Sequence, residues 1–334
     1  MIAPQRLWSG LGALETTVAG LAWLGGALAA VAQGWIFPTA ALLPPMGLLV
    51  VNLAAAMATR PGLRGSVPLL LFHAALLFFL LLLGVSRLTY FKGQAEVTEG
   101  IPFDGTVIGS ESGPWHRNRL DRVEFAQQGF EIDYALGLRR GEIRNRVRWR
   151  DEFGEAREGG IDDDHPLVLE GYRFYPTANK GFAAVLTWTP RGGVPTEGSV
   201  HLSSYPSHAV PSIDWTLPGS DIPALTLLRM ADPPADPERP FSFRLPEKHE
   251  LVLTIGGETR ALRPGEVWDR LEGRLEYQRL TTWMGYLIHY DPAKPWLIVA
   301  AFFAVGCLGW HFARRFARRD WTEDVTSPLP PGEG

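Results

Sequence analysis

The chain has 334 residues, a formal net charge of −4 and 46% hydrophobic residues. Its 32 basic and 36 acidic side chains are nearly balanced, which argues against a nucleic-acid binder, because such proteins need clustered basic residues to neutralise phosphates. The single cysteine, Cys307, excludes an internal disulfide and a CxxC redox pair.

Charged side chains are rare in the first quarter of the chain. Residues 87–294 contain most of them, and residues 1–86 contain only Arg6, Glu15, Arg60 and Arg64. A soluble core does not segregate its charges in this way. The distribution therefore argues against a simple cytosolic enzyme.

Four apolar stretches are long enough to span a bilayer, which requires about 20 apolar residues. They are residues 13–32, 37–59, 66–86 and 295–313. Pro44 and Pro45 predict that the regular helix of the second stretch begins near Pro45. A cleaved signal peptide is the alternative for the first stretch. It lacks a compact apolar core followed by an A-x-A site and a second span follows at once, so we expect a retained helix.

The basic residues beside these spans predict the orientation, because cytoplasmic loops are enriched in Lys and Arg. The short turn over residues 33–38 carries no basic residue, whereas Arg6 precedes the first span and Arg60 and Arg64 lie between the second and third. The arginines after the fourth span are Arg314, Arg315, Arg318 and Arg319, and the long segment 87–294 is exempt from this count. Both termini are therefore expected in the cytoplasm of a bacterium, with the chain crossing its inner membrane. Residues 87–294 would be extracytoplasmic, and residues 314–334 would form a basic and then disordered cytoplasmic tail.

Residues 87–294 have the pattern of a mainly antiparallel β domain. Apolar and polar residues alternate over 130–135 and 143–149, as in strands with one wet face. Gly256-Gly257 indicates a hairpin. Further strands are expected at 167–175, 181–189, 241–245, 251–255 and 283–290.

Some parts of this domain do not favour a strand. Residues 222–230 and 267–275 also allow a short helix, and 190–198 and 231–240 are expected to be long loops. No internal repeat is present. The fold class is therefore a membrane protein with four transmembrane α-helices and a large extracytoplasmic β domain.

His73 is the main candidate for a functional residue. It lies about 10 Å into the third span, because it is about seven residues from the cytoplasmic end and a helix rises 1.5 Å per residue. An ionisable group at that depth indicates function, and neutral imidazole is a common ligand of haem iron and other metals. The alternative is a structural hydrogen bond to a neighbouring helix, for example that of Asn52.

His311 is a weaker candidate at the cytoplasmic end of the fourth span. Arg314 and Arg315 follow it, so a histidine at the membrane interface is the simpler interpretation. A site shared with His73 would require the third and fourth spans to touch.

The remaining sequence predicts no catalytic residue and no metal site. His201 and His208 flank a loop and are only a weak indication of a metal site. Asp162, Asp163 and Asp164 are expected to form a solvated turn. The other histidines have no ligand spacing, and no nucleophile or phosphate motif is present. Trp8, Trp35, Trp296 and Trp310 lie near span ends, where indole rings are common in membrane proteins.

Four segments carry a resemblance to a known family. Residues 48–60 (LLVVNLAAAMATR) form a Leu-rich span with an Asn and a closing Arg, and residues 65–84 place a Gly before an apolar run containing His73. The stretch DHPLVLEGYRFYP begins at Asp164, and residues 285–292 (GYLIHYDP) lead into the fourth span. In this order the segments resemble the ResB family of system II cytochrome c biogenesis proteins, which has three spans, one large extracytoplasmic β segment and a final span.

The resemblance implies a function. ResB proteins act with a ResC-like membrane partner to move haem across the membrane and present it to apocytochrome c, and the histidine of the third span, here His73, would be an axial ligand of a transient haem b. The chain would be a non-catalytic subunit. It departs from the family where Asp164 replaces an Asn, Pro176 a Gln and Ala293 a Gly, and it is short for the family.

Two other functions remain open. The first is a membrane-anchored extracytoplasmic receptor or scaffold with no haem role, in which His73 is structural. The second is a membrane hydrolase, and the lack of a nucleophile–base pattern in the sequence argues against it.

Overall fold

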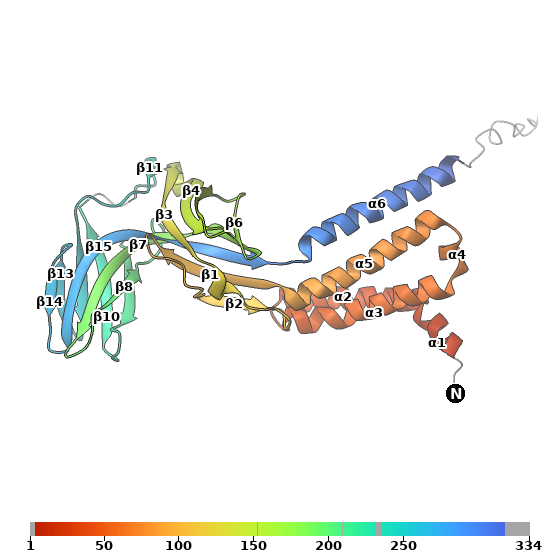
Figure 1. Cartoon of the computed structure of the whole chain (residues 1–334), viewed down its shortest axis with the longest axis horizontal. Helices are drawn as coiled ribbons and strands as arrows, with labels where there is room; N and C mark the ends of the chain where they lie inside the picture. The colour runs from red at the N-terminus through yellow and green to blue at the C-terminus, as the bar shows by residue number, and fades with distance from the viewer. Residues whose placement is uncertain (1–3, 152, 209, 232–234, 318–334) are drawn as a thin grey trace, which may run out of the picture. The chain divides into compact units, whose positions relative to one another are not determined.

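The computed structural model describes residues 4–151, 153–208, 210–231 and 235–317. The chain divides into two compact units. The helical unit comprises residues 4–90, 112–116 and 291–317, and the β unit comprises residues 91–111 and 117–290 (Figure 1). The expected tail beyond residue 317, with Arg318 and Arg319, lies outside the described residues.

Four helices of the helical unit are long and apolar enough to cross a membrane. They are α2 (Leu14–Ala32), α3 (Pro38–Thr59), α5 (Val67–Thr89) and α6 (Lys294–Ala317). Two short helices accompany them, α1 (Pro4–Leu11) and α4 (Pro61–Arg64). All four predicted spans are confirmed as helices.

The prediction for the second span was wrong in one respect. Helix α3 begins at Pro38, with Pro44 and Pro45 inside it. The fixed φ of proline is itself helical, and Pro38 suits the first helical position, where its missing N–H needs no partner. The two internal prolines remove hydrogen bonds but do not end the helix.

The helices pack through small residues. Helix α3 packs against α2 and α5, and α5 packs against α6. Gly20 lies so close to Leu49 that a Cβ there would be 2.8 Å from the Leu49 side chain. Small residues that let backbones approach are typical of helix contacts in membranes. The buried alanines are Ala27, Ala41, Ala55, Ala75, Ala300 and Ala304.

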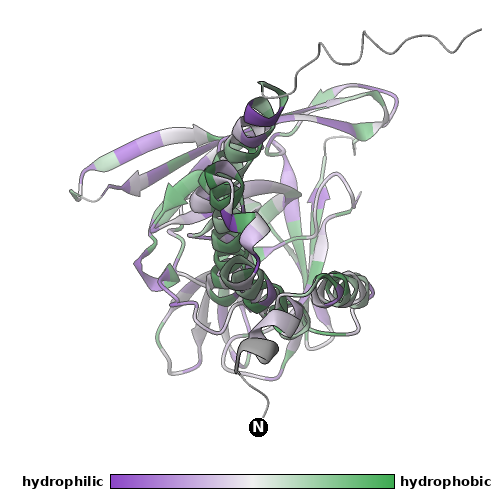
Figure 2. Ribbon diagram, turned by 90° about the vertical axis from the view of Figure 1, so that its right-hand side faces the viewer, coloured by the Kyte–Doolittle hydropathy of each residue, from purple (hydrophilic) through white to green (hydrophobic). Residues whose placement is uncertain are grey.

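The outer faces of the helices remain apolar. Phe302 is 76% exposed and Val305 is 70% exposed on α6, and Figure 2 shows the helices coloured mostly hydrophobic. A water-soluble protein rarely exposes apolar surface on this scale. Of the four long helices, α5 is the most apolar and has the smallest buried share.

Asp291 joins the ends of two of these helices. Its Oδ1 accepts the N–H of Ala293 (3.0 Å) at the start of α6, and its Oδ2 accepts the hydroxyl of Ser86 (2.9 Å) near the end of α5. A carboxylate at a helix N-terminus satisfies free backbone donors. The Asp-Pro dipeptide of the 285–292 segment therefore has a clear structural role.

The β unit contains three sheets. The central, seven-stranded sheet has the order β2-β1-β15-β7-β6, with β14 on β15 and β8 on β7. Its strands are β1 (Phe91–Thr98), β2 (Gly109–Ser112), β6 (Leu167–Leu169), β7 (Tyr172–Pro190), β8 (Thr196–His201), β14 (Val267–Asp269) and β15 (Gly273–Tyr290).

Two four-stranded sheets complete the unit. One has the order β11-β3-β4-β5 and the other β13-β12-β10-β9. The first consists of β3 (Phe125–Ala135), β4 (Arg139–Arg150), β5 (Ala156–Ile161) and β11 (Phe241–Ser242). The second consists of β9 (Ser212–Thr216), β10 (Pro223–Met230), β12 (His249–Ile255) and β13 (Glu258–Leu262). Two short 3₁₀ turns are η1 (Leu120–Arg122) and η2 (Leu136–Leu138).

The mainly antiparallel β architecture is confirmed. The long pair β7–β15 and its neighbours β1 and β8 are antiparallel, and their inward residues belong to one large apolar core. Gly256 and Gly257 form the hairpin between β12 and β13 with φ values of 57° and 87°, as a type I′ turn requires.

Several strand boundaries differ from those expected. Residues 222–230 form strand β10 rather than a helix, because alternate side chains are buried between two partner strands. Residues 267–275 likewise contribute to β14 and β15. The expected strand 241–245 shrinks to two residues, and β8 begins inside the expected loop 190–198.

Candidate functional site

His73 lies in α5, and its own helix determines which ring nitrogen carries the proton. Its Nδ1 is 2.7 Å from the carbonyl oxygen of Leu69, one turn earlier. A carbonyl can only accept, so Nδ1 donates, and in a neutral imidazole Nε2 then carries the lone pair. The Phe72 ring packs edge-on against the imidazole, with 5.2 Å between ring centroids.

This arrangement suits a metal ligand. Histidines that bind metals commonly donate their second N–H to a carbonyl or carboxylate, which fixes the tautomer and ring orientation. Within the described parts of the chain, Nε2 of His73 has no hydrogen-bond partner. The His73 residue is half-buried within the chain, and Nε2 is the ring nitrogen left for a ligand from outside it.

Asn52 does not bond to His73, although a structural bond between them was the alternative. Its side-chain amide donates to the carbonyl oxygens of Leu11 (2.6 Å) and Ala13 (3.1 Å), and its Oδ1 accepts the hydroxyl of Thr17 (2.8 Å). These acceptors lie at the break between α1 and α2. Asn52 therefore ties α3 to this break.

The structure does not bring His311 to His73. The Nδ1 of His311 is 3.2 Å from the hydroxyl of Ser66, the N-cap residue of α5. Ser66 precedes His73 by seven residues, about 10 Å along the helix axis. Two imidazoles on one metal ion would need their nitrogens within about 4 Å, given bonds of about 2 Å. Helices α5 and α6 do touch, but the two rings lie at different depths.

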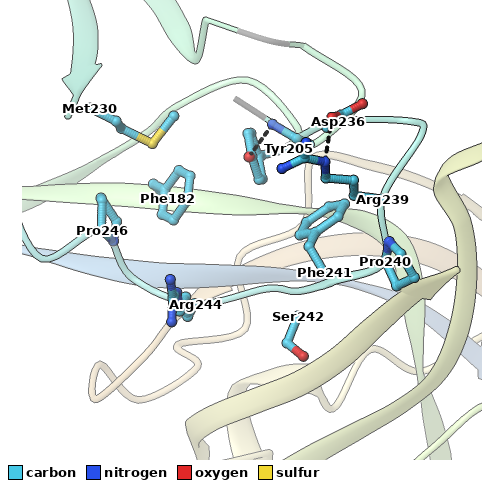
Figure 3. Close-up of a pocket in the computed structure, with 11 residues that line it drawn as sticks. Phe182, Tyr205, Met230, Asp236, Arg239, Pro240, Phe241, Ser242, Arg244 and Pro246 are labelled. Atoms are coloured by element: carbon cyan, nitrogen blue, oxygen red, sulfur yellow. Dashed lines mark hydrogen bonds and ion pairs between the residues drawn. The ribbon is translucent and has the colours of Figure 1, made fainter. Parts of the chain in front are cut away.

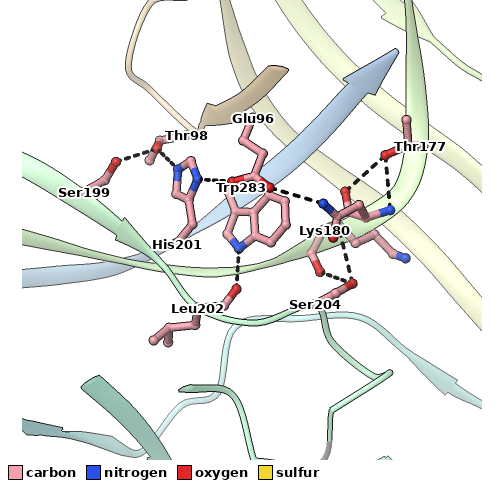
Figure 4. A network of polar contacts seen from close by, with 10 residues as sticks. Glu96, Thr98, Thr177, Lys180, Ser199, His201, Leu202, Ser204 and Trp283 are labelled. Carbon is pink, nitrogen blue, oxygen red and sulfur yellow. Dashed lines mark hydrogen bonds and ion pairs between the residues drawn. The ribbon is translucent and has the colours of Figure 1, made fainter. Parts of the chain in front are cut away.

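A second cluster of polar side chains lies in the β unit (Figure 4). The Nδ1 of His201 is 2.8 Å from Glu96 Oε2, and its Nε2 is 2.7 Å from the Thr98 hydroxyl. The Thr98 hydroxyl is also 2.7 Å from that of Ser199. Since Nδ1 faces a carboxylate that can only accept, it donates, and in neutral His201 Nε2 accepts from Thr98.

Trp283 and Gly181 hold His201 in place. The indole of Trp283 stacks on the imidazole at 5.2 Å and 12°, and its Nε1 donates to the carbonyl oxygen of Leu202 (3.0 Å). Trp283 pairs with Gly181 across β15 and β7. A Cβ at Gly181 would lie 3.0 Å from the indole nitrogen and 3.1 Å from the Ser203 carbonyl oxygen, so a larger residue would have to displace the indole or the backbone by a few tenths of an ångström.

Nothing in the sequence pattern indicates this cluster, since it brings together residues of β1, β8 and β15. The order carboxylate, imidazole and hydroxyl is that of a nucleophile triad. Thr98 is only 4% exposed, however, and a nucleophile must reach its substrate. The cluster is therefore structural. We call Glu96, Thr98, His201 and Trp283 the clip, because their contacts join β1, β8 and β15.

Lys180 lies in β7, directly before Gly181, and is almost fully buried. Its ammonium donates to the carbonyl oxygen of Ala178 (3.0 Å) and lies 5.5 Å from the centre of the Tyr134 ring. Burial, and to a lesser extent the positive charge of Arg140, lower the pKa of Lys180 to about 8. Burial also raises the pKa of Tyr134 to about 12.

The other sequence candidates serve as local structure. Asp162 accepts the backbone N–H groups of Asp164 and His165, which confirms the expected turn. The Nδ1 of His208 bonds the carbonyl oxygen of Ser204 within its own loop. Over the described ranges, no group of three or more His, Cys, Asp or Glu side chains is placed to hold a metal ion.

Two comparisons with known proteins found no match. No protein-family model matches the chain, and no curated protein matches it. The resemblance to the ResB family therefore rests on the four segments of the sequence alone.

Proposed function

We propose that this protein is a membrane subunit of a haem-delivery and assembly complex for c-type cytochrome maturation. The observation that carries the proposal is the imidazole of His73, set in the most apolar helix with Nδ1 bonded to Leu69 and Nε2 available. The resemblance of four segments to the ResB family supplies the cargo, a transient haem b, and the partners, a ResC-like membrane protein and apocytochrome c.

The proposed setting is the bacterial inner membrane, with both termini in the cytoplasm. Arg60 and Arg64 lie in the link between α3 and α5, and Arg314 and Arg315 lie in the last turn of α6. The turn between α2 and α3 has no basic residue. Under the positive-inside rule the β unit is then extracytoplasmic.

The residues of this chain would orient the cargo rather than react with it. Leu69 fixes the tautomer of His73, so that Nε2 points its lone pair away from the helix backbone. A ligand there must come from the lipid side or from a partner helix, since little of α5 is buried within the chain. The ResC-like partner would supply a further ligand to the haem iron and the attachment chemistry.

Replacing His73 tests this proposal. The complex, purified with its partner, should show haem absorbance that His73→Ala lowers at least tenfold and that added imidazole restores, because free imidazole can occupy the vacated ligand position. His311→Ala is the matched control and should keep the absorbance, since its ring lies at the level of Ser66. Full retention of haem by His73→Ala would refute the role of this residue.

A second function is favoured by an open cavity in the β unit, lined by aromatic and basic side chains. In that case the chain is a membrane-anchored extracytoplasmic receptor or scaffold. An intact complex that purifies without haem, with both histidines present, would favour this function.

A further inference from the structure

A cavity of about 510 Å³ lies in the β unit, and none of the residues that line it belongs to the clip around His201. It is formed where the central sheet, the end of β10 and the segment around β11 meet. Its volume falls within the range of about 300–1,000 Å³ that is usual for small-molecule sites. Figure 3 shows the side chains around it.

Three aromatic side chains are among the residues that line it, and Phe241 is the most exposed of the three. Phe182, Tyr205 and Phe241 line the cavity, and Met230 adds a flexible apolar side chain. The ring of Phe182 packs 5.2 Å from that of Tyr205, and Phe241 stacks at 4.7 Å on Tyr134 behind it. Rings held by their neighbours form a rigid surface on which a flat apolar molecule can pack.

Two arginines supply positive charge at the cavity. Arg239 lies 3.6 Å from the carboxylate of Asp236 and is partly neutralised. Arg244 is exposed and has no ion-pair or hydrogen-bond partner among the residues that the structure describes. In Figure 3 Arg244 lies well apart from the paired Arg239. Arginine binds carboxylates and similar anions through its planar array of donors.

We propose that this cavity binds a small organic anion with a flat aromatic body. The ring of Phe241, backed by the buried Tyr205 and Phe182, packs against the body of the ligand, and Arg244 binds its acidic group. Arg239 becomes a second anion contact when its pairing with Asp236 is broken. This site is independent of the haem proposal, because it uses no residue of the helical unit.

Fluorescence titration of the full-length protein in phosphatidylcholine nanodiscs tests the site. The anionic probe is 8-anilinonaphthalene-1-sulfonate and the neutral one is N-phenyl-1-naphthylamine, with the signal of empty discs subtracted. We expect one saturable site for the anionic probe. Arg244→Gln should weaken its binding about tenfold, because a charged hydrogen bond is lost, and should change binding of the neutral probe less than twofold.

Two further variants separate charge from damage to the fold. Asp236→Asn frees Arg239 and should strengthen binding of the anionic probe severalfold, a gain that misfolding cannot produce. Arg260→Gln, an exposed arginine on β13 outside the cavity, is the matched control and should change binding less than twofold.

Competition tests the aromatic part of the proposal. Naphthoate should displace the anionic probe at a concentration at least fivefold lower than decanoate, an aliphatic acid of similar size and equal charge. Equal displacement would contradict an aromatic site. The proposal is overturned if no saturable binding exceeds that of empty discs, or if Arg244→Gln and Arg260→Gln have equal effects.

Discussion

Lys180 is a residue whose burial gives a measurable pH dependence. Its pKa falls from 10.5 to about 8, so the folded protein disfavours the charged form. The cost is fully present below pH 8. It is relieved as the pH rises toward 10.5, because the unfolded chain then holds a proton that the folded chain has lost.

Lys180→Met should therefore raise the free energy of unfolding at pH 7 by about 2 kcal/mol, somewhat less than the full value of the pKa shift because the bond to Ala178 is lost. The gain should shrink between pH 8 and 10. Unfolding of the full chain in detergent, followed against pH beside the wild type, measures it. A gain that stays constant over this range would contradict a buried, titrating lysine.

Gly181 is a second residue for which the structure gives a specific prediction. Gly181→Ala places a methyl group 3.0 Å from the Trp283 indole and 3.1 Å from a carbonyl oxygen. Overpacking of this kind costs about 1–3 kcal/mol, and it should also shift the Trp283 fluorescence by displacing His201. Gly198→Ala on β8 is the control, because no atom lies within 4 Å of its added Cβ. Equal stability of the two variants would show that the indole does not lie across Gly181.

At this scale the sequence singles out isolated residues more readily than pairs. His73 stands out because an ionisable group in a long apolar run is rare. The pairing of His201 with Glu96 was not predictable, because it joins strands whose residues are 105 positions apart and depends on how β1 and β8 lie across the sheet. Nothing in the sequence marks Arg244 as a binding residue, because an exposed arginine in a loop is common.

At the scale of elements, the helices were more predictable than the strands. A bilayer requires a fixed length of apolar chain, so the spans could be placed to within a few residues. Strand β10 was open to a helical interpretation because its burial depends on β9 and β12, which lie on either side of it. The start of α3 was predicted wrongly for a related reason. Prolines usually interrupt a helix, but the long apolar helix α3 continues through Pro44 and Pro45.

The prediction for the helices concerns the contribution of Asn52 to stability. Asn52→Ala removes the three bonds that tie α3 to the break between α1 and α2. Side-chain hydrogen bonds between membrane helices contribute about 0.6 kcal/mol each on average, so we expect a loss of about 1–3 kcal/mol in detergent. Thr59→Ala, whose hydroxyl bonds only within its own helix, should lose less. Equal losses would assign Asn52 no special role.

At the scale of the whole molecule, the uneven distribution of charge predicts the division into a helical unit and a β unit. The central proposal also needs the β unit on the outer side of the membrane, where apocytochrome c would receive haem. Single cysteines in a Cys307→Ala background test this orientation. Suitable exposed positions are Trp35 in the turn between α2 and α3, Val194 in the β unit and Gly62 in α4.

Labelling these cysteines with a membrane-impermeant maleimide is the most direct measurement. We predict that Trp35→Cys and Val194→Cys react in intact cells, and that Gly62→Cys reacts only after the inner membrane is permeabilised. Reaction of Gly62→Cys in intact cells, with Val194→Cys protected, would place the β unit in the cytoplasm and contradict the proposed function.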